Sequence, residues 1–156
     1  MVGLQETAAV TRAFDEMAAR FAGASFRGVL LAEQVTGGLE VIVGIKRDPV
    51  FGPVVLAGLG GVWTEVLHDA AVRLAPVDDE EALGMLGQLR SAPLLSGIRG
   101  SAPRDTRALA GLIARISLLA VEHPEIAELD LNPVSVLPEG QGALIVDVRI
   151  ITAPVP

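Results

Sequence analysis

The chain has 156 residues, 51% of them apolar, with a formal net charge of −7 and no cysteine. An acidic balance argues against nucleic acid or an anionic membrane as a partner, because both require basic surface. The lack of cysteine excludes a disulfide framework, a zinc–thiolate site and a thiol nucleophile. No apolar run approaches a membrane span, and the start lacks a secretory signal. We expect a single cytoplasmic domain over residues 1–152 and a frayed tail at 153–156.

The first half of the chain predicts one helix followed by strands. Apolar residues recur at helical spacing from Gln5 to Ala22, and Gly23 supplies a stop. Extended apolar runs separated by turn-forming residues then predict strands. The expected strands are Gly28–Val35, Leu39–Ile45, Val54–Ala57 and Val72–Ala75, with a turn-rich loop at Lys46–Pro53 and a break at Gly58–Gly61.

The second half predicts helices and then a closing hairpin. Asp78 or Asp79 caps a helix through about Arg90, and residues 94–98 form a short turn. Asp105 caps an amphipathic helix through about Glu122. Strands, then helices, then strands predict an α+β fold, in which a largely antiparallel sheet packs against helices.

The closing hairpin carries the most informative polar residues. Glu128, Asp130 and Asn132 alternate with leucines, so on a strand their side chains leave the same face. If residues 138–141 form the hairpin loop, Asn132 lies opposite Asp147 and Asp130 lies opposite Arg149. The other, mostly aliphatic face then pairs Leu129 with Ile150, Leu131 with Val148 and Ser135 with Leu144.

The spacing leaves two interpretations of the polar face open. Directly opposed residues have Cβ atoms about 4.5–5.5 Å apart. That is close enough for Asp130, Asn132 and Asp147 to share one hard cation such as Mg²⁺. A solvated strand face with a cross-strand pair between Asp130 and Arg149 explains the same pattern.

Several motifs occur together in one order and spacing. They are Gly37-Gly-Leu-Glu-Val-Ile-Val-Gly44, Lys46-Arg-Asp-Pro-Val-Phe-Gly-Pro53, Gly58-Leu-Gly-Gly61 with Glu65, and Asp130-Leu-Asn-Pro133 with Asp147. As a set, and over nearly the whole chain, they resemble the C-terminal part of the ATP-grasp domain of NDP-forming acyl-CoA synthetases. This family includes relatives of the succinyl-CoA synthetase β-subunit.

The resemblance implies a reaction and a set of ligands. Members of the family interconvert an acyl-CoA, ADP and phosphate with a free acid, CoA and ATP, through an acyl phosphate and a phosphohistidine. Asn132 and Asp147 match the Mg²⁺-binding Asn and Asp of the family, and Asp130 matches its acidic position two residues before that Asn. The implied nucleotide contacts, to ATP or ADP, are Glu33, Glu40, Lys46, Gly60 and Gly61.

Simpler explanations of these nucleotide contacts stay open. Glu33 and Glu40 are also explained as strand-edge charges, Gly60 and Gly61 as a sharp turn, and Lys46 as part of a solvated loop. In the family, the segment that passes the nucleotide base usually has a sequence similar to Val-Gln-Glu-Met. Here this segment is Leu31-Ala-Glu-Gln34, so the part of the chain implied in base recognition is altered.

The resemblance implies no catalytic residue in this chain. The phosphorylated histidine of the family belongs to a separate CoA-ligase domain or subunit, so neither His68 nor His123 takes that role. His68 reads as an ordinary polar residue, and His123 as a helix-end cap before Pro124.

The expected partners are the parts of the family's enzymes that the matched region does not include. The smaller ATP-grasp lobe, with its phosphate-gripping lysine, and the CoA-ligase domain are both expected to come from elsewhere. Surfaces that the missing lobe would cover predict self-association. Two alternatives are an inactive remnant that serves as a binding or assembly module, and the ATP-grasp-like part of an acetyltransferase fusion.

Overall fold

The computed structural model describes residues 1–22, 26–60, 69–98 and 100–153. Its contacts divide the chain into two compact units, Met1–Thr36 and Gly37–Pro156, which we call the N-terminal and the C-terminal unit. Each unit is described by itself, and the single domain expected over residues 1–152 stays a prediction. Among the described residues, no helix is long and apolar enough to cross a bilayer.

The N-terminal unit contains the helix α1, Thr7–Arg20, which confirms the helix expected near Gln5–Ala22. The strand expected over Gly28–Val35 is wrong, because this segment is irregular and pairs with no strand of the described chain. Its apolar side chains are largely exposed, with Leu30 at 93%. Apolar residues favour a strand only where neighbouring strands bond their backbone groups.

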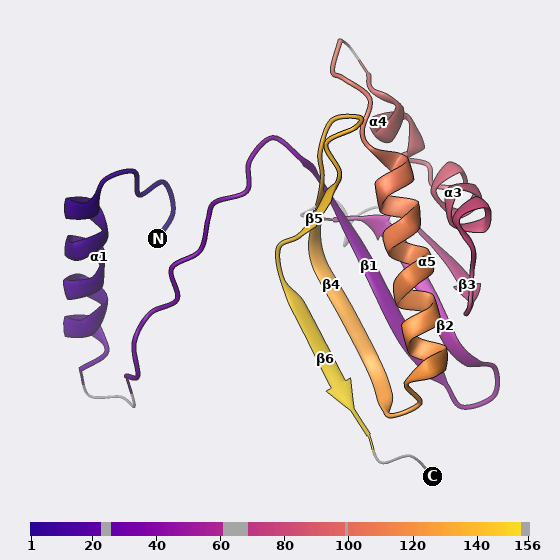
Figure 1. The fold of residues 1–156 in the computed structure, drawn as a ribbon, viewed down its shortest axis with the longest axis horizontal. Helices are drawn as coiled ribbons and strands as arrows, with labels where there is room; N and C mark the ends of the chain where they lie inside the picture. The colour runs from indigo at the N-terminus through magenta and orange to yellow at the C-terminus, as the bar shows by residue number, and fades with distance from the viewer. Residues whose placement is uncertain (23–25, 61–68, 99, 154–156) are drawn as a thin grey trace. The chain divides into compact units, whose positions relative to one another are not determined.

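The C-terminal unit is a six-stranded antiparallel sheet in the order β3-β2-β1-β4-β5, with β6 also paired to β4 (Figure 1). This arrangement confirms the α+β fold with an antiparallel sheet. The strands are β1 (Leu39–Asp48), β2 (Gly52–Leu59), β3 (Ala70–Leu74), β4 (Ile126–Val136), β5 (Ala143–Ile145) and β6 (Val148–Thr152).

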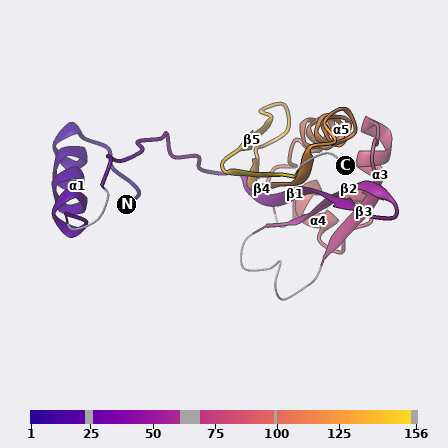
Figure 2. The same cartoon turned by 90° about the horizontal axis from the view of Figure 1, so that it is seen from below.

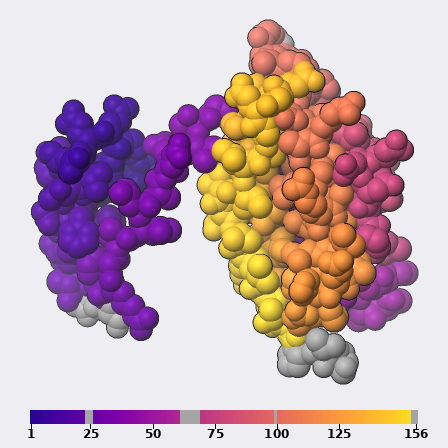
Figure 3. All heavy atoms as spheres, viewed as in Figure 1, coloured from indigo at the N-terminus to yellow at the C-terminus, as the bar shows by residue number. Residues whose placement is uncertain are grey.

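Within the described residues of the C-terminal unit, three helices accompany the sheet: α3 (Asp79–Gly87), α4 (Ala92–Ser96) and α5 (Thr106–Glu122). Asp78 caps α3 by accepting a hydrogen bond from the N–H of Glu81, and Asp105 caps α5 through the N–H of Ala108. The sequence predicts the cap at Asp105, and of the two candidates Asp78 and Asp79 the structure selects Asp78. Figure 2 shows α3 and α5 on one side of the sheet, and Figure 3 shows α5 in orange beside the yellow β5–β6 segment.

The core lies between α5, α3 and the sheet face that they cover. Alternation along β1 and β2 sends every second side chain into it. The buried apolar residues include Val41, Val43 and Ile45 of β1, Val55 and Ala57 of β2, and Leu109, Ile113, Ile116 and Ala120 of α5. The other face of the sheet, which α3 and α5 leave uncovered, is called the open face below.

Candidate metal and nucleotide site

The strand β4 changes its side-chain phase at a β-bulge. Its register with β1 shifts by one between Val41 and Val43, so that Ile42 faces two residues of β4, Asn132 and Pro133. Proline has no N–H to give to a ladder, and a bulge is one of the few places in a sheet that accept it. The Asn-Pro pair therefore sits at an interruption that β4 can tolerate, in the middle of the sheet.

The bulge corrects one detail of the predicted hairpin. Leu129 and Leu131 are buried before it, whereas Val134 and Val136 are buried after it. Ser135 lies between two core valines and opposite Glu40 of β1, so it belongs to the open face. Strict alternation along the strand places Ser135 on the aliphatic face. The extra residue in the bulge reverses the alternation after Asn132, so this expectation is wrong.

The predicted register of the closing hairpin is confirmed. In β6, Arg149 pairs with Asp130, and in β5, Leu144 pairs with Ser135. At the junction between these strands, the N–H of Asn132 donates to the carbonyl oxygen of Asp147 at 3.2 Å. Asn132 and Asp147 are thus cross-strand neighbours, one in the bulge of β4 and the other at the break between β5 and β6.

The three predicted metal ligands, Asp130, Asn132 and Asp147, are exposed in this structure. Oδ1 of Asp147 accepts the N–H of Val148 at 2.9 Å, while the side chains of Asp130 and Asn132 make no hydrogen bond or ion pair with the described residues. Two carboxylates and one amide oxygen form a donor set that suits a hard cation such as Mg²⁺.

No group of three His, Cys, Asp or Glu side chains is close enough to hold a metal within the described residues. The candidate donors at this hairpin are therefore two carboxylates and the amide oxygen of Asn132. The role of the three residues as metal ligands stays a prediction.

The segment Lys46–Asp48 belongs to β1, which corrects the expected loop at Lys46–Pro53. Lys46 lies on the open face, where its Nζ is 3.8 Å from Oε1 of Glu128 across the strand pair. The Lys46 side chain is 75% exposed, so this ion pair is worth about 0–1 kcal/mol. Its ammonium group therefore stays accessible to an anion.

The Arg47 side chain points to the other face and caps the C-terminal end of α5, a role that the sequence analysis missed. Its Nη2 donates to the carbonyl oxygen of Ala120 at 2.7 Å and to that of His123 at 3.3 Å, and its Nε donates to that of Ile126. The last carbonyls of a helix lack partners within the helix and attract a cation. Extending the predicted strand through Asp48 would have placed Lys46 and Arg47 on opposite faces.

Asp48 closes the turn between β1 and β2. Its Oδ1 accepts the N–H groups of Phe51 and Val50, and these hydrogen bonds lower the pKa of its carboxyl group. Arg47 and Asp48 thus have structural partners, and of these three neighbouring residues only Lys46 remains a candidate contact for an anion.

Gly60 continues the pairing of β1 and β2 beyond the end of β2. Its N–H donates to the carbonyl oxygen of Glu40 at 2.8 Å, and a Cβ there would lie 3.0 Å from the Glu40 carbonyl carbon. This close approach explains the glycine, and a nucleotide contact at Gly60 or Glu40 stays a prediction. Residues 61–68, with Gly61, Trp63, Glu65 and His68, lie outside the described residues.

Glu33 belongs to the N-terminal unit, where it is exposed in the irregular segment after Gly28. The remaining predicted residues with a described position belong to the C-terminal unit. His123 ends α5, where its N–H donates to the carbonyl oxygen of Leu119, which confirms the predicted cap.

The open face has a shallow depression beside Asp130, with a volume of about 340 Å³. Gly44 pairs with Asp130 and has no side chain to fill the space next to that carboxylate. Leu56 and Val72 line one side of the depression, and Arg149 lies on another. Of the predicted metal ligands, Asp130 therefore borders a hollow with an apolar floor and charged edges.

Comparison with known proteins places this chain in a family. The ATP-grasp domain model matches residues 1–152. A 4-hydroxybutyrate–CoA ligase (ADP-forming) of Nitrosopumilus maritimus is 47% identical over 81% of this chain and 18% of its own length. The β subunit of acetate–CoA ligase (ADP-forming) I of Pyrococcus furiosus is 44% identical over 80% of this chain and 53% of the subunit.

A solved structure shares the fold. The acetyl-coenzyme A synthetase 1 of Ca. Korarchaeum cryptofilum, in complex with coenzyme A and Mg-AMPPCP, matches with a TM-score of 0.88 and 37% identity. The match covers 98% of this chain and 67% of that chain. This chain spans about a fifth of the long single-chain relatives and about half of the β subunit. It belongs to the ATP-grasp domain family and is similar to the corresponding part of ADP-forming acyl-CoA ligases.

Proposed function

We propose that this chain forms one wall of the Mg²⁺-nucleotide site of an NDP-forming acyl-CoA synthetase. The observation that carries the proposal is the hairpin register, which brings Asn132 opposite Asp147 and Asp130 onto the same face of the sheet. Relatives with 44–47% identity are named as ADP-forming ligases, which supports the same assignment. The reaction would convert an acyl-CoA, ADP and phosphate to the free acid, CoA and ATP.

In this proposal Asp130, Asn132 and Asp147 hold Mg²⁺ against the nucleotide phosphates. The ion would neutralise charge that develops during phosphoryl transfer. The exposed ammonium group of Lys46 would meet an anionic group from the open face, and Glu33, Glu40, Gly60 and Gly61 would contact the nucleotide. No residue of this chain would form a covalent intermediate.

The proposal requires partners. A CoA-ligase domain or subunit would bring the phosphorylated histidine, and a second ATP-grasp lobe would enclose the nucleotide from the opposite side. We also propose a cytoplasmic location, and self-association of the chain when those partners are absent. Without an opposing wall, the chain by itself should bind nucleotide weakly.

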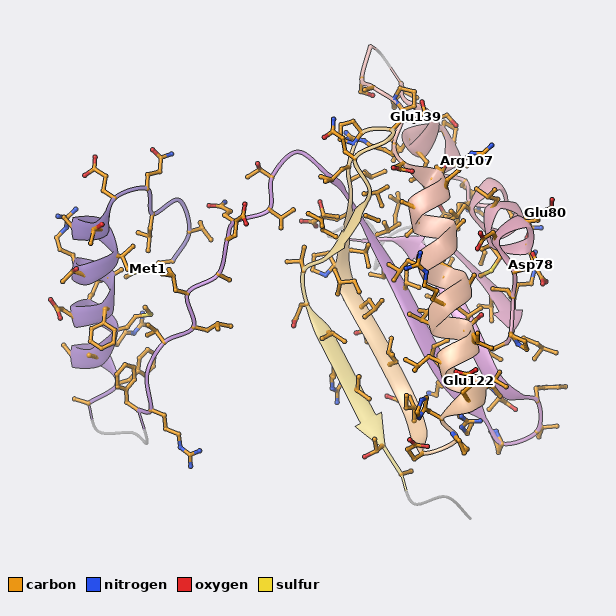
Figure 4. The ribbon with its side chains drawn as sticks, in the orientation of Figure 1. Met1, Asp78, Glu80, Arg107, Glu122 and Glu139 are labelled. Atoms are coloured by element: carbon orange, nitrogen blue, oxygen red, sulfur yellow. The ribbon has the colours of Figure 1, made fainter. Side chains whose placement is uncertain are left out.

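The test measures Mn²⁺, a spectroscopic substitute for Mg²⁺, by electron paramagnetic resonance in the presence of ADP. Asp147→Asn should weaken ADP-dependent Mn²⁺ binding by at least about tenfold. Glu80→Gln is the matched control, because it removes one carboxylate from α3, away from the hairpin (Figure 4). Equal Mn²⁺ affinity in the wild type and Asp147→Asn would overturn the metal assignment.

A second measurement tests the reaction. Candidate partner chains are added, and ADP-forming acyl-CoA turnover is followed. Turnover in one combination, abolished by Asp147→Asn, is the expected result. No turnover in any combination, together with no binding of Mg²⁺-nucleotide by calorimetry, would contradict the enzyme assignment.

A further inference from the structure

Asp105 joins the start of α5 to the loop of the hairpin that carries the proposed metal ligands. Its Oδ1 accepts the N–H of Ala108 at 3.0 Å, in the first turn of α5. Its Oδ2 accepts the N–H of Gly142 at 2.9 Å, at the end of the loop between β4 and β5. One carboxylate therefore caps a helix and holds a hairpin loop at the same time.

The backbone around Asp105 adds further contacts to the same loop. The N–H of Asp105 donates to the carbonyl oxygen of Leu137 at 2.9 Å, and the N–H of Glu139 donates to that of Pro103 at 2.9 Å. Figure 4 places Glu139 at the same end of the unit as Arg107, in the first turn of α5. The loop is thus held along its length by the segment that enters α5.

The loop determines which residues of the hairpin face each other. Within it, the N–H of Leu137 donates to the carbonyl oxygen of Gly142 at 3.0 Å, which starts the pairing of β4 with β5. The same register continues to the contact between Asn132 and Asp147. A slip by one residue would turn alternate side chains to the other face and separate that pair.

We infer that Asp105 is a positioning residue for the metal-binding hairpin, a role beyond that of a helix cap. Its second oxygen fixes the loop, and the loop in turn fixes Asn132 opposite Asp147. The metal part of this inference rests on the proposed function, whereas the structural part does not. The hydrogen bonds that define the role are those from Ala108 and Gly142.

The chain contains a matched control for this inference. Asp78 caps α3 by accepting the N–H of Glu81 at 2.8 Å, and within the described residues no hydrogen bond or ion pair joins its side chain to the hairpin. Serine caps a helix about as well as aspartate but has a single side-chain oxygen. Asp105→Ser should therefore keep the cap of α5 and lose the hydrogen bond from Gly142. Asp78→Ser should keep the cap of α3 and lose no other hydrogen bond of the side chain.

The experiment compares Asp105→Ser, Asp78→Ser and the wild type in two measurements. Amide hydrogen exchange by NMR follows the N–H groups of Asn132 and Val146, which cross the hairpin away from the substitution. Mn²⁺ binding is followed by electron paramagnetic resonance. Asp105→Ser should speed exchange at both amides and weaken Mn²⁺ binding by about tenfold, the effect usual for residues that orient metal ligands. Asp78→Ser should change neither.

The outcomes separate this inference from the proposed function. Unchanged exchange and unchanged Mn²⁺ affinity in Asp105→Ser would overturn the inference, and so would faster exchange with unchanged affinity. If the wild type binds no Mn²⁺, the metal assignment in the proposed function fails, and the exchange data still decide whether Asp105 fixes the hairpin. If Asp105→Ser does not fold, Asp105→Asn is used, since its side chain has nearly the same shape but only one acceptor oxygen.

Discussion

Two apolar runs of similar composition have different structures in this protein. Residues 52–59 form β2, which lies between β1 and β3 and sends Val55, Ala57 and Leu59 into the core. Residues 28–35 form no strand, and Leu30 and Leu31 are mostly exposed. Residues with high β-propensity therefore form a strand here only where a neighbouring strand bonds at least one backbone edge and a layer covers one face.

The same contrast extends to the two units. Ala13 is the only apolar residue of the described N-terminal unit that is buried, whereas the described C-terminal unit contains a continuous core of helix and sheet residues. Apolar burial is the main favourable term in folding. We therefore expect the free energy of unfolding to depend mainly on the C-terminal unit, and the substitutions below test that expectation from the largest effect to the smallest.

The same substitution in the two apolar runs should have unequal effects. Val55→Ala removes two buried methyl groups, and it should lower the free energy of unfolding by about 1.5–3 kcal/mol. Val29 is 41% exposed, and Val29→Ala should cost less than about 0.5 kcal/mol. Denaturation by guanidinium, followed by circular dichroism, measures both. Equal losses would show that the run at 28–35 is packed as tightly as β2.

Glycine substitutions should reveal how closely β2 approaches β3. A Cβ at Gly58 would lie 2.7 Å from the carbonyl oxygen of Asp69, so Gly58→Ala should cost about 1–3 kcal/mol. A Cβ at Gly84 in α3 would meet no atom within 4 Å, and Gly84→Ala should stabilise the protein by about 0.5–1 kcal/mol. Thermal unfolding gives the sign of each change, and a stabilising Gly58→Ala would contradict the tight contact.

The neighbouring cations Lys46 and Arg47 of β1 should contribute unequally to the free energy of unfolding. Arg47→Ala removes two hydrogen bonds to the end of α5 and one to the start of β4, and it should cost about 1.5–3 kcal/mol. Lys46→Ala removes an exposed ion pair and should cost less than about 1 kcal/mol. The two free energies of unfolding are compared at low and high salt. If Lys46→Ala is the more damaging, the assignment of the two faces is wrong.

Acid should loosen the β1–β2 turn through Asp48. Hydrogen bonds from the N–H groups of Phe51 and Val50 lower the pKa of Asp48 below its ordinary value of 3.8. The stabilisation from this carboxylate is therefore present above pH 3.8 and is lost as the pH falls through the lowered pKa. Amide exchange at Phe51 should accelerate over that acidic range in the wild type, and Asp48→Asn should lack this dependence.

Local patterns predicted much of the C-terminal unit and its candidate site. Alternation around Asp130 and Asn132, together with a four-residue loop, gave the register that brings Asn132 opposite Asp147. The bulge at Pro133 was missed, because it arises where β4 pairs with β1, which is distant in the sequence. The partners of Arg47 were missed for the same reason, since they belong to the far end of α5 and the start of β4.

The sequence by itself determined the features that depend on spacing and on single residues. These are the amphipathic face of α5, the cap at Asp105, the cap of α3 to within one residue, and the hairpin that carries the candidate metal ligands. The tertiary structure decided which apolar runs became strands, which face each part of β4 presents, and which polar groups have partners. The physical reason is that periodicity is local, whereas strand pairing and burial join residues that are far apart in the chain.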